Sequence, residues 1–374
     1  MAAPRSTATA RGRRQPECSP GASRRRARPP LSRTADLPLA VWPCAQRTGQ
    51  WQRHGRYVPE SNRHPAKMLP EIARRAISFY SQPGDLVLDP MCGIATTLVE
   101  AIHQDRRAIG VELEPRWAAL AAENIGHARS QGASRQAIVL KDDARRLGRG
   151  VLDELSGTVS LILTSPPYAD TTLGDPRSGK GMALTRASEG RRVTAADRAH
   201  ASKVKRSCRY GDRAPCLARL PYGSVQAAIV PAAGDDGSER SETYLSSMAA
   251  VYAGCARLLA PGGFLVLVTK NMRTGGTLSN LTGDTTRLCQ HAGLDYWQHI
   301  VALLATVRDG ELRPRPSLWQ LLNLRHALAR GERTHLVCHE DVLVFQKPQS
   351  SLSSRKLNPS DAGHAGGSHH PNER

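Results

Sequence analysis

Four consecutive residues near the middle of the chain have the types that could hold an aromatic amino group. They directly follow a short apolar run, and they are Ser165, Pro166, Pro167 and Tyr168. Two prolines in a row fix the backbone and remove two N–H donors, so the carbonyls point outward as rigid acceptors. The Pro166 carbonyl and the Ser165 oxygen can accept the two hydrogens of the amine and direct its lone pair at an electrophilic methyl group, while Tyr168 offers a stacking face for a flipped-out base. The alternatives are a plain β-turn and a ligand for a WW domain.

Three other positions have residue types that suit a nucleoside. The first is the segment Asp89-Pro90-Met91-Cys92-Gly93-Ile94-Ala95-Thr96-Thr97. It reads as a strand, a tight turn and a helix, where Gly93 allows close backbone approach and the helix N-terminus offers N–H groups. Glu112 ends the next strand, from which a carboxylate can take both hydroxyls of a ribose, and Asp143 follows a third strand and suits an adenine amino group. Each acid alone could be a helix cap, but together and in order they favour a nucleoside cofactor.

Short β-branched runs alternate with helical patterns around these residues. We expect strands at 86–89, 108–112, 137–141, 161–164 and 264–269, and helices at 96–103, 117–128 and 244–259, the last stopped by Pro261-Gly262-Gly263. The stretches 296–306 and 335–347 are expected to form a closing strand pair at one edge. This alternation predicts an α/β fold with a doubly wound, mostly parallel sheet. All the candidate residues then lie at carboxyl ends of strands, where open α/β sheets bind ligands.

The overall composition restricts the possible partners. The chain has 374 residues, with 52 Lys and Arg against 33 Asp and Glu and a formal net charge of +19. This surplus favours a polyanionic partner, of which nucleic acid is the commonest. No apolar stretch approaches the roughly 20 residues of a membrane-spanning helix, so an integral membrane protein is not expected. Eight cysteines without a CxxC pair argue against a zinc ribbon and a disulfide scaffold, and they predict a reducing compartment such as the cytoplasm.

The charge is unevenly distributed and suggests the domain boundaries. Residues 1–40 are expected to be a disordered basic arm, since 1–35 contain nine arginines and a single acid. This arm could bind nucleic acid, act as an organellar transit peptide, or be an upstream extension from a wrong start codon. We expect the main domain over 41–347, with a flexible, basic insertion at 171–241 that is a lid, a backbone clamp or a solvated loop. A disordered tail over 348–374 follows.

Here the chain resembles the S-adenosylmethionine-dependent DNA amino-methyltransferases, the N4-cytosine/N6-adenine family. The family's motif I corresponds to residues 89–97, its motif IV to 165–168, and its motif X to His64-Pro65-Ala66-Lys67. The order X, I, IV fits the family's γ arrangement, and the likeness spans roughly residues 60–347. It implies a Rossmann-like sheet of the class I methyltransferase type, no metal, and S-adenosylmethionine as cofactor, held by Lys67, Asp89, Pro90, Gly93, Glu112 and Asp143. Motif IV would then present the base through Ser165, Pro166, Pro167 and Tyr168.

The resemblance also implies a substrate. A serine at the start of motif IV is typical of the cytosine-N4 enzymes, so we expect site-specific methylation of cytosine N4 in DNA, as in restriction–modification systems. Three substitutions depart from motif I, and Ala95 in particular adds a Cβ that we expect beside the cofactor. The alternatives are an RNA guanine-N2 or adenine-N6 methyltransferase and a non-catalytic nucleic-acid binder. Cytosine-C5 chemistry at Pro43-Cys44 or Pro215-Cys216 is a weaker reading, because neither pair is expected to follow a sheet strand in the right place. A metal pair at Cys208 and Cys216 is weaker because no matching His cluster accompanies it.

Overall fold

The computed structural model describes residues 37–64, 66–147, 149–167, 216–217, 220–229, 242–274, 277–316 and 318–349. The chain divides into residues 1–39 and a compact unit beginning at Ala40, and the fold below is that of the second unit. The arm predicted at 1–40, the tail at 348–374 and most of the insertion at 171–241 lie outside the described residues. The described part of that insertion includes the short helix α7 (Val225–Ile229), which packs on the apolar core.

The centre of this unit is an eight-stranded sheet with the order β1-β9-β12-β6-β5-β2-β3-β4. All neighbouring strands run parallel except β12, which is antiparallel to both β6 and β9. The predicted doubly wound, mostly parallel α/β sheet is therefore confirmed. The strands are β1 (Val41–Pro43), β2 (Leu86–Asp89), β3 (Arg107–Val111), β4 (Ala137–Leu140), β5 (Val159–Thr164), β6 (Leu259–Thr269), β9 (Asp295–Leu303) and β12 (His339–Gln346).

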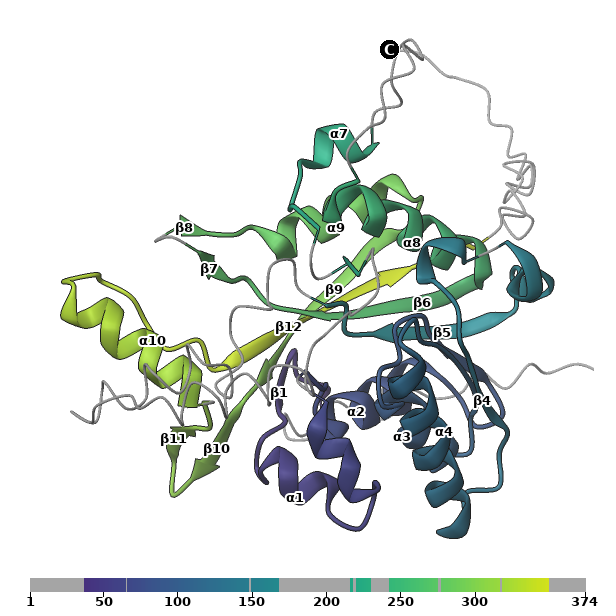
Figure 1. The fold of residues 1–374 in the computed structure, drawn as a ribbon, viewed down its shortest axis with the longest axis horizontal. Coiled ribbons are helices and arrows are strands. Elements are labelled where there is room, and N and C mark those ends of the chain that lie inside the picture. The colour runs from purple at the N-terminus through teal and green to yellow at the C-terminus, as the bar shows by residue number, and fades with distance from the viewer. Residues whose placement is uncertain are drawn as a thin grey trace, which may run out of the picture. The chain divides into compact units, whose positions relative to one another are not determined.

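Helices cover both faces of this sheet (Figure 1). One face carries α1 (Gly49–Arg53), α2 (Pro70–Tyr80), α3 (Thr96–Ile102) and α4 (Pro115–Ser130), and the other carries α8 (Tyr244–Leu258) and α9 (Leu281–His291). Side chains alternate along a strand, so β5 packs against the helices on both faces of the sheet. Leu161 and Leu163 pack toward α2 and α3, whereas Ile162 packs toward α8. This two-sided burial explains why the strand sequences are almost wholly apolar.

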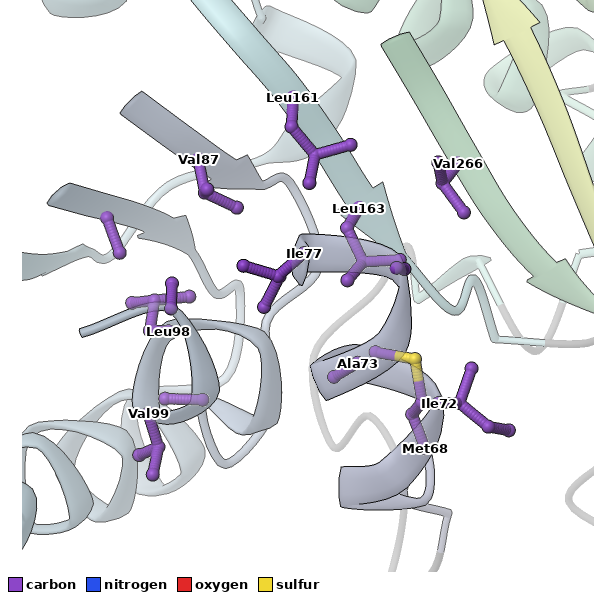
Figure 2. Packing of buried hydrophobic residues seen from close by; sticks show 14 of the residues in the cluster. Met68, Ile72, Ala73, Ile77, Val87, Leu98, Val99, Leu161, Leu163 and Val266 are labelled. Carbon is purple, nitrogen blue, oxygen red and sulfur yellow. The ribbon is translucent and has the colours of Figure 1, made fainter. Parts of the chain in front are cut away.

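The first layer is held by the apolar stripe of α2 (Figure 2). Ile72, Ala73 and Ile77 recur at helical spacing and are fully buried. Figure 2 shows them beside Leu98 and Val99 of α3 and below strand residues such as Leu161 and Val266. Full burial of each large aliphatic side chain contributes on the order of 1.5–3 kcal/mol, so this layer holds the helices that carry the candidate site firmly on the sheet.

Two details of the sheet differ from the sequence-based expectation. The expected helix over 244–259 ends at Leu258, but the following strand begins earlier than expected, because Pro261-Gly262-Gly263 lie within β6 (Leu259–Thr269) and not ahead of it. A Cβ on Gly263 would lie 3.1 Å from carbonyl oxygens of β5, so glycine permits this close strand contact. The expected pair of closing strands does form, as β9 and β12, but β12 lies between β6 and β9, and the edge position belongs to β1.

The remaining elements lie outside the main sheet. They are the 3-10 turns η2 (Pro59–Arg63), η3 (Ala144–Arg146) and η4 (Gly150–Leu155), the hairpins β7 (Arg273–Thr274) with β8 (Thr277–Leu278) and β10 (Ala305–Arg308) with β11 (Glu311–Pro314), and the helix α10 (Leu318–Ala329). Within the described ranges, no helix combines the length and the apolar character that crossing a membrane requires.

Candidate active site

The turn that follows β2 is built around the buried Asp89. Its Oδ2 accepts a hydrogen bond from Thr97 Oγ1 at 2.6 Å, and its Oδ1 accepts one from the N–H of Met91 at 3.1 Å. Burial raises the pKa of Asp89 to about 6, against the effect of these hydrogen bonds. The carboxylate thus joins the end of β2 to α3, and the structure gives Asp89 the role of shaping the turn, together with the buried Pro90 that follows it.

Glu112 holds the same turn from the neighbouring strand. Its Oε2 accepts the N–H of Gly93 at 2.9 Å, and its Oε1 accepts the N–H of Glu114 at 2.8 Å. Burial raises the pKa of Glu112 to about 7, and the negative charges of Glu114 and Asp89 add to the effect. Each carboxylate oxygen has a second lone pair, so Glu112 can also accept hydrogen bonds from two hydroxyl groups.

Ala95 adopts a backbone conformation that is typical of glycine, the residue that the family's motif I has at this position. Its φ is +66°, in the left-handed region, where it forms the N-cap of α3. An L-residue with a Cβ is strained in this region by roughly 1–2 kcal/mol. The expected position of the Ala95 methyl beside a ligand differs from what we find, because the side chain is fully buried in the core cluster below the turn.

A cavity of about 190 Å³ lies at the carboxyl ends of β3 and β4. Its apolar lining includes Val111, Leu140, Leu147 and Leu152, and its polar lining includes Asp142, Asp143 and Arg146. A small aromatic heterocycle suits this combination of apolar walls with polar groups at one side. The position directly after Val111 places Glu112 next to the cavity.

Asp143 lies in this lining, but its carboxylate already has a partner. Arg145 Nε lies 2.9 Å from Asp143 Oδ1 and 3.0 Å from Oδ2, and the same Oδ1 caps η3 by accepting the N–H of Arg145. Burial raises the pKa of Asp143, yet the Arg145 guanidinium outweighs it and the pKa is lowered. Arg145 also forms an ion pair with Glu242, just before α8. Sequence analysis missed Arg145, although its place two residues after a capping acid was a usable signal.

The segment that resembles motif X lies directly against this turn. A Cβ on Gly93 would be 3.3 Å from His64 Nε2, so the His64 ring covers the glycine. His64 is buried and meets the Trp117 ring edge-on at 4.5 Å, and burial lowers its pKa to about 3. Lys67 Nζ donates a hydrogen bond to the carbonyl oxygen of His64, so the ammonium group stabilises the backbone of the motif X segment itself. The structure therefore brings motifs X and I together, with His64 in contact with the turn.

The predicted amine-binding motif begins where β5 ends. Ser165 is half-buried, Pro166 is buried and Pro167 is half-buried, while Tyr168 lies outside the described residues. The hydroxyl of Thr97, which donates to Asp89, also lies 3.4 Å from the carbonyl oxygen of Leu163. Since its one proton goes to Asp89, the Thr97 hydroxyl only packs against β5 at this point, and the turn after β2 lies next to the strand that presents Ser165. Sequence analysis included Thr97 in motif I but gave it no such role.

No group of three or more His, Cys, Asp or Glu side chains within the described ranges is placed to hold a metal ion. Of the residues predicted from sequence, the structure gathers Asp89, Pro90, Gly93, Glu112 and Asp143 at the ends of three adjacent strands, with Ser165 and Pro166 at the next. Such an arrangement suits a nucleoside and an acceptor side by side.

The strand order, with one antiparallel strand inserted beside β6, defines a Rossmann-like sheet of the class I methyltransferase type. Comparison with known proteins makes the relationship more specific. Residues 14–123 match a family model described as DNA methylase. This match includes motifs X and I, and it confirms the resemblance to the S-adenosylmethionine-dependent DNA amino-methyltransferases.

The individual relatives are similar over short stretches only. The type II methyltransferase M.BglI of Bacillus subtilis is 36% identical over 72 residues, which is 18% of this chain and 21% of that protein. The tRNA (guanine(10)-N2)-dimethyltransferase of Methanothermobacter thermautotrophicus is 33% identical over 106 residues, 28% of this chain and 29% of that protein. The chain thus spans less than a third of the length of these relatives. A solved structure of TrmN from Thermus thermophilus covers 79% of this chain and 53% of its own, at 16% identity and a TM-score of 0.38.

These findings support S-adenosylmethionine as the cofactor, and the described residues fit it. The cavity beside Val111 and Leu140 suits an adenine ring, and the second lone pairs of the Glu112 carboxylate suit ribose hydroxyls. The backbone at Gly93 is left without a Cβ where the turn faces Glu112 and His64. The cavity and the Glu112 carboxylate are separate observations, and each matches a different part of the cofactor, whereas His64 already occupies the space over Gly93.

Proposed function

We propose that the protein transfers a methyl group from S-adenosylmethionine to an exocyclic amine of a base in DNA, with cytosine N4 as the target. The supporting observation is the hydroxyl of Thr97, which lies 2.6 Å from Asp89 and 3.4 Å from the Leu163 carbonyl. The cofactor turn therefore lies beside the strand that ends in Ser165 and Pro166, and the pairing of β2 with β5 holds the two strands together. Donor and acceptor sites are thus fixed to one another by a rigid part of the fold, as a transfer between two bound molecules requires.

The cofactor supplies an electrophilic methyl group when it is bound. In our proposal the chain positions the cofactor and the target base. Glu112 accepts hydrogen bonds from the ribose hydroxyls of the cofactor, and the cavity lined by Val111 and Leu140 binds its adenine ring. The Ser165 oxygen and the Pro166 carbonyl accept the hydrogens of the target amine, which turns its lone pair toward the methyl group. As the new N–C bond forms, the bond between the methyl carbon and the sulfonium sulfur would break to leave a neutral thioether, and the amine would release one proton to water.

A product analysis tests this proposal directly. Purified protein is incubated with S-adenosylmethionine and either duplex DNA or tRNA, and the nucleic acid is digested to nucleosides for mass spectrometry. N4-methylcytosine in DNA is the expected product. N6-methyladenine in DNA would overturn the base assignment while leaving DNA methylation in place. Methylated tRNA with unmodified DNA would overturn the proposed substrate.

A second candidate is the methylation of guanine N2 in tRNA. It is favoured by the similarity to tRNA (guanine(10)-N2)-dimethyltransferases of two archaea, at 33% and 32% identity over 106 and 111 residues. The same incubation separates the two candidates, because N2-methylguanosine appears only if this one is correct.

A further inference from the structure

The hairpin formed by β10 and β11 is exposed on both of its faces. Every residue from 307 to 315 is exposed. Its turn residues, Asp309 and Gly310, have φ values of +53° and +76°, which is the type I′ geometry that matches the twist of a tight hairpin. An isolated two-stranded ribbon is only marginally stable in water, so a preformed ribbon without cover on either side is suited to a partner that covers it.

The two faces of this ribbon differ in chemistry. The register pairs Thr306 with Arg313, Val307 with Leu312, and Arg308 with Glu311. Because side chains alternate, Arg308 and Arg313 share one face, and Val307 and Leu312 share the other. The ribbon is therefore amphipathic, with two guanidinium groups and the single Glu311 carboxylate on one side, which leaves that side a net positive charge.

The guanidinium groups are available for a ligand. The Arg308 side chain forms no ion pair or hydrogen bond with any residue that the structure describes, and the ion pair of this hairpin joins Arg313 to Glu311. Arg313 lies 3.3 Å from Glu311, with 55% and 71% of the two side chains exposed. An ion pair with this exposure contributes little, so it does not compete strongly with a polyanion.

The ribbon also lies at the functional edge of the sheet. β9 is antiparallel to β12, as β6 is, so β9 ends at the same edge as β5 and its Ser165. Figure 1 shows β10 and β11 beyond that end of β9. The base of the ribbon is anchored there, because Thr306 Oγ1 and Arg315 Nε donate to the carbonyl of Ala45 at 3.0 Å and 2.9 Å.

We infer that the β10–β11 ribbon is the surface that grips duplex DNA beside the target base, with Arg308 and Arg313 on the phosphate backbone. This inference rests on the proposed function. A major groove of B-DNA accommodates a two-stranded ribbon, and arginines on one face can then reach the phosphates that border the groove. In this inference the ribbon orients the protein on the duplex, while methyl transfer takes place at the site that includes Ser165.

The test compares two double variants with equal loss of charge. Arg308→Ala with Arg313→Ala removes the guanidinium face. The control, Arg107→Ala with Arg257→Ala, removes exposed arginines at the start of β3 and the end of α8, at the opposite edge of the sheet. Binding to a fluorescein-labelled duplex is followed by anisotropy between 50 and 200 mM salt. Calorimetry with S-adenosylmethionine checks that each variant is folded.

We expect the ribbon variant to lose about 0.9 from the slope of log affinity against log salt for each arginine, hence about 1.8 in total. The control variant keeps the wild-type slope, and Arg308→Lys with Arg313→Lys restores most of it. Equal slopes in the ribbon and control variants overturn the inference. A ribbon variant that loses tRNA binding but keeps duplex binding overturns its DNA assignment.

The proposed function is read out separately, from the nucleosides that the wild-type protein modifies. A wild type that methylates DNA, with a ribbon variant that binds duplex unchanged, refutes the ribbon alone. A wild type that leaves DNA unmodified refutes the proposed function, whatever the slopes are.

Discussion

The carboxylate of Glu112 accepts the N–H of Gly93 at 2.9 Å, so the end of β3 fixes the turn that follows β2. One side chain therefore positions the turn and, in our proposal, binds the ribose. Burial raises the pKa of this carboxyl to about 7, so at neutral pH a substantial part of the free protein carries a neutral Glu112.

This pKa predicts a pH-dependent cofactor affinity. Ribose hydroxyls and a cationic sulfonium favour the ionised carboxylate, so the pKa of Glu112 should be lower in the complex than in the free protein. Below pH 7 binding then releases a proton, and affinity should rise from pH 5.5 to 7 and level off above it. We expect an increase of roughly three- to tenfold, measured by calorimetry, since one proton gives at most a tenfold change per pH unit.

Glu112→Gln is the control for this dependence. It keeps the shape of the side chain but has no titrating group, so its affinity should be flat with pH. Loss of charged hydrogen bonds should weaken binding by about 1–3 kcal/mol at pH 7.5. A variant with wild-type affinity would remove Glu112 from the cofactor site.

Thr97→Val should destabilise the protein. Valine cannot donate to the buried Asp89 carboxylate, and leaving such an acceptor without its partner costs about 1–3 kcal/mol. Urea unfolding at pH 7 measures the change. Thr96→Val is the matched control, because Thr96 is the neighbouring buried threonine and should cost less than about 0.5 kcal/mol. Equal losses in both variants would contradict a special role of the Thr97 hydroxyl.

Tyr168→Ala should lower the rate of methyl transfer and leave cofactor affinity unchanged. Stacking of a base on an aromatic ring contributes roughly 1–3 kcal/mol, which corresponds to a rate loss of about 5- to 150-fold in single-turnover assays. Tyr168→Phe keeps the ring and should retain most of the rate. If phenylalanine is as damaging as alanine, the role of Tyr168 is not stacking.

Ser165→Ala should also reduce transfer without affecting the cofactor. It removes one acceptor for the amine but leaves the Pro166 carbonyl, so we expect a loss of roughly tenfold, near the contribution of one hydrogen bond. The same single-turnover assay, with calorimetry of S-adenosylmethionine, measures both quantities. Weakened cofactor binding would place Ser165 in the nucleoside pocket instead.

Removal of residues 1–35 tests the proposed nucleic-acid role of the basic arm. The truncated protein should show lower non-specific DNA affinity and a flatter salt dependence, because fewer counterions are released. Cofactor affinity should be unchanged. An identical salt slope in the full and truncated chains would favour a targeting segment or a wrongly chosen start.

The strands were predictable because their apolar character is local. Runs such as Leu86–Asp89 and Val159–Thr164 are buried on both faces, and this is visible in the sequence itself. The interior place of β12 was not predictable, because strand order depends on pairing between segments far apart in the chain. The early start of β6 was not predictable for a related reason. Pro261-Gly262-Gly263 suggested a break before the strand, but Gly263 is needed for the close contact with β5, which a single segment does not reveal.

In the candidate site, too, local features were predictable from the sequence and contacts between distant segments were not. Residue types at strand ends indicated Glu112 and Asp143, but their partners were not visible in the sequence. The bond from Glu112 to Gly93 and that from Arg145 to Asp143 exist only once separate loops are folded together. Ala95 illustrates the limit most clearly, since the direction of its methyl group depends on a backbone φ of +66°.

The place of β12 has a consequence for how the chain is made. β12 is the last strand of the described chain, yet it lies inside the sheet, between β6 and β9. Both of those strands emerge from the ribosome well before it, and until residues 339–346 follow, each has an unpaired edge. Such edges invite pairing with other chains. During synthesis the protein therefore depends on late insertion of a strand, and a product that ends before His339 exposes the edges of β6 and β9 in addition to those of β1 and β4.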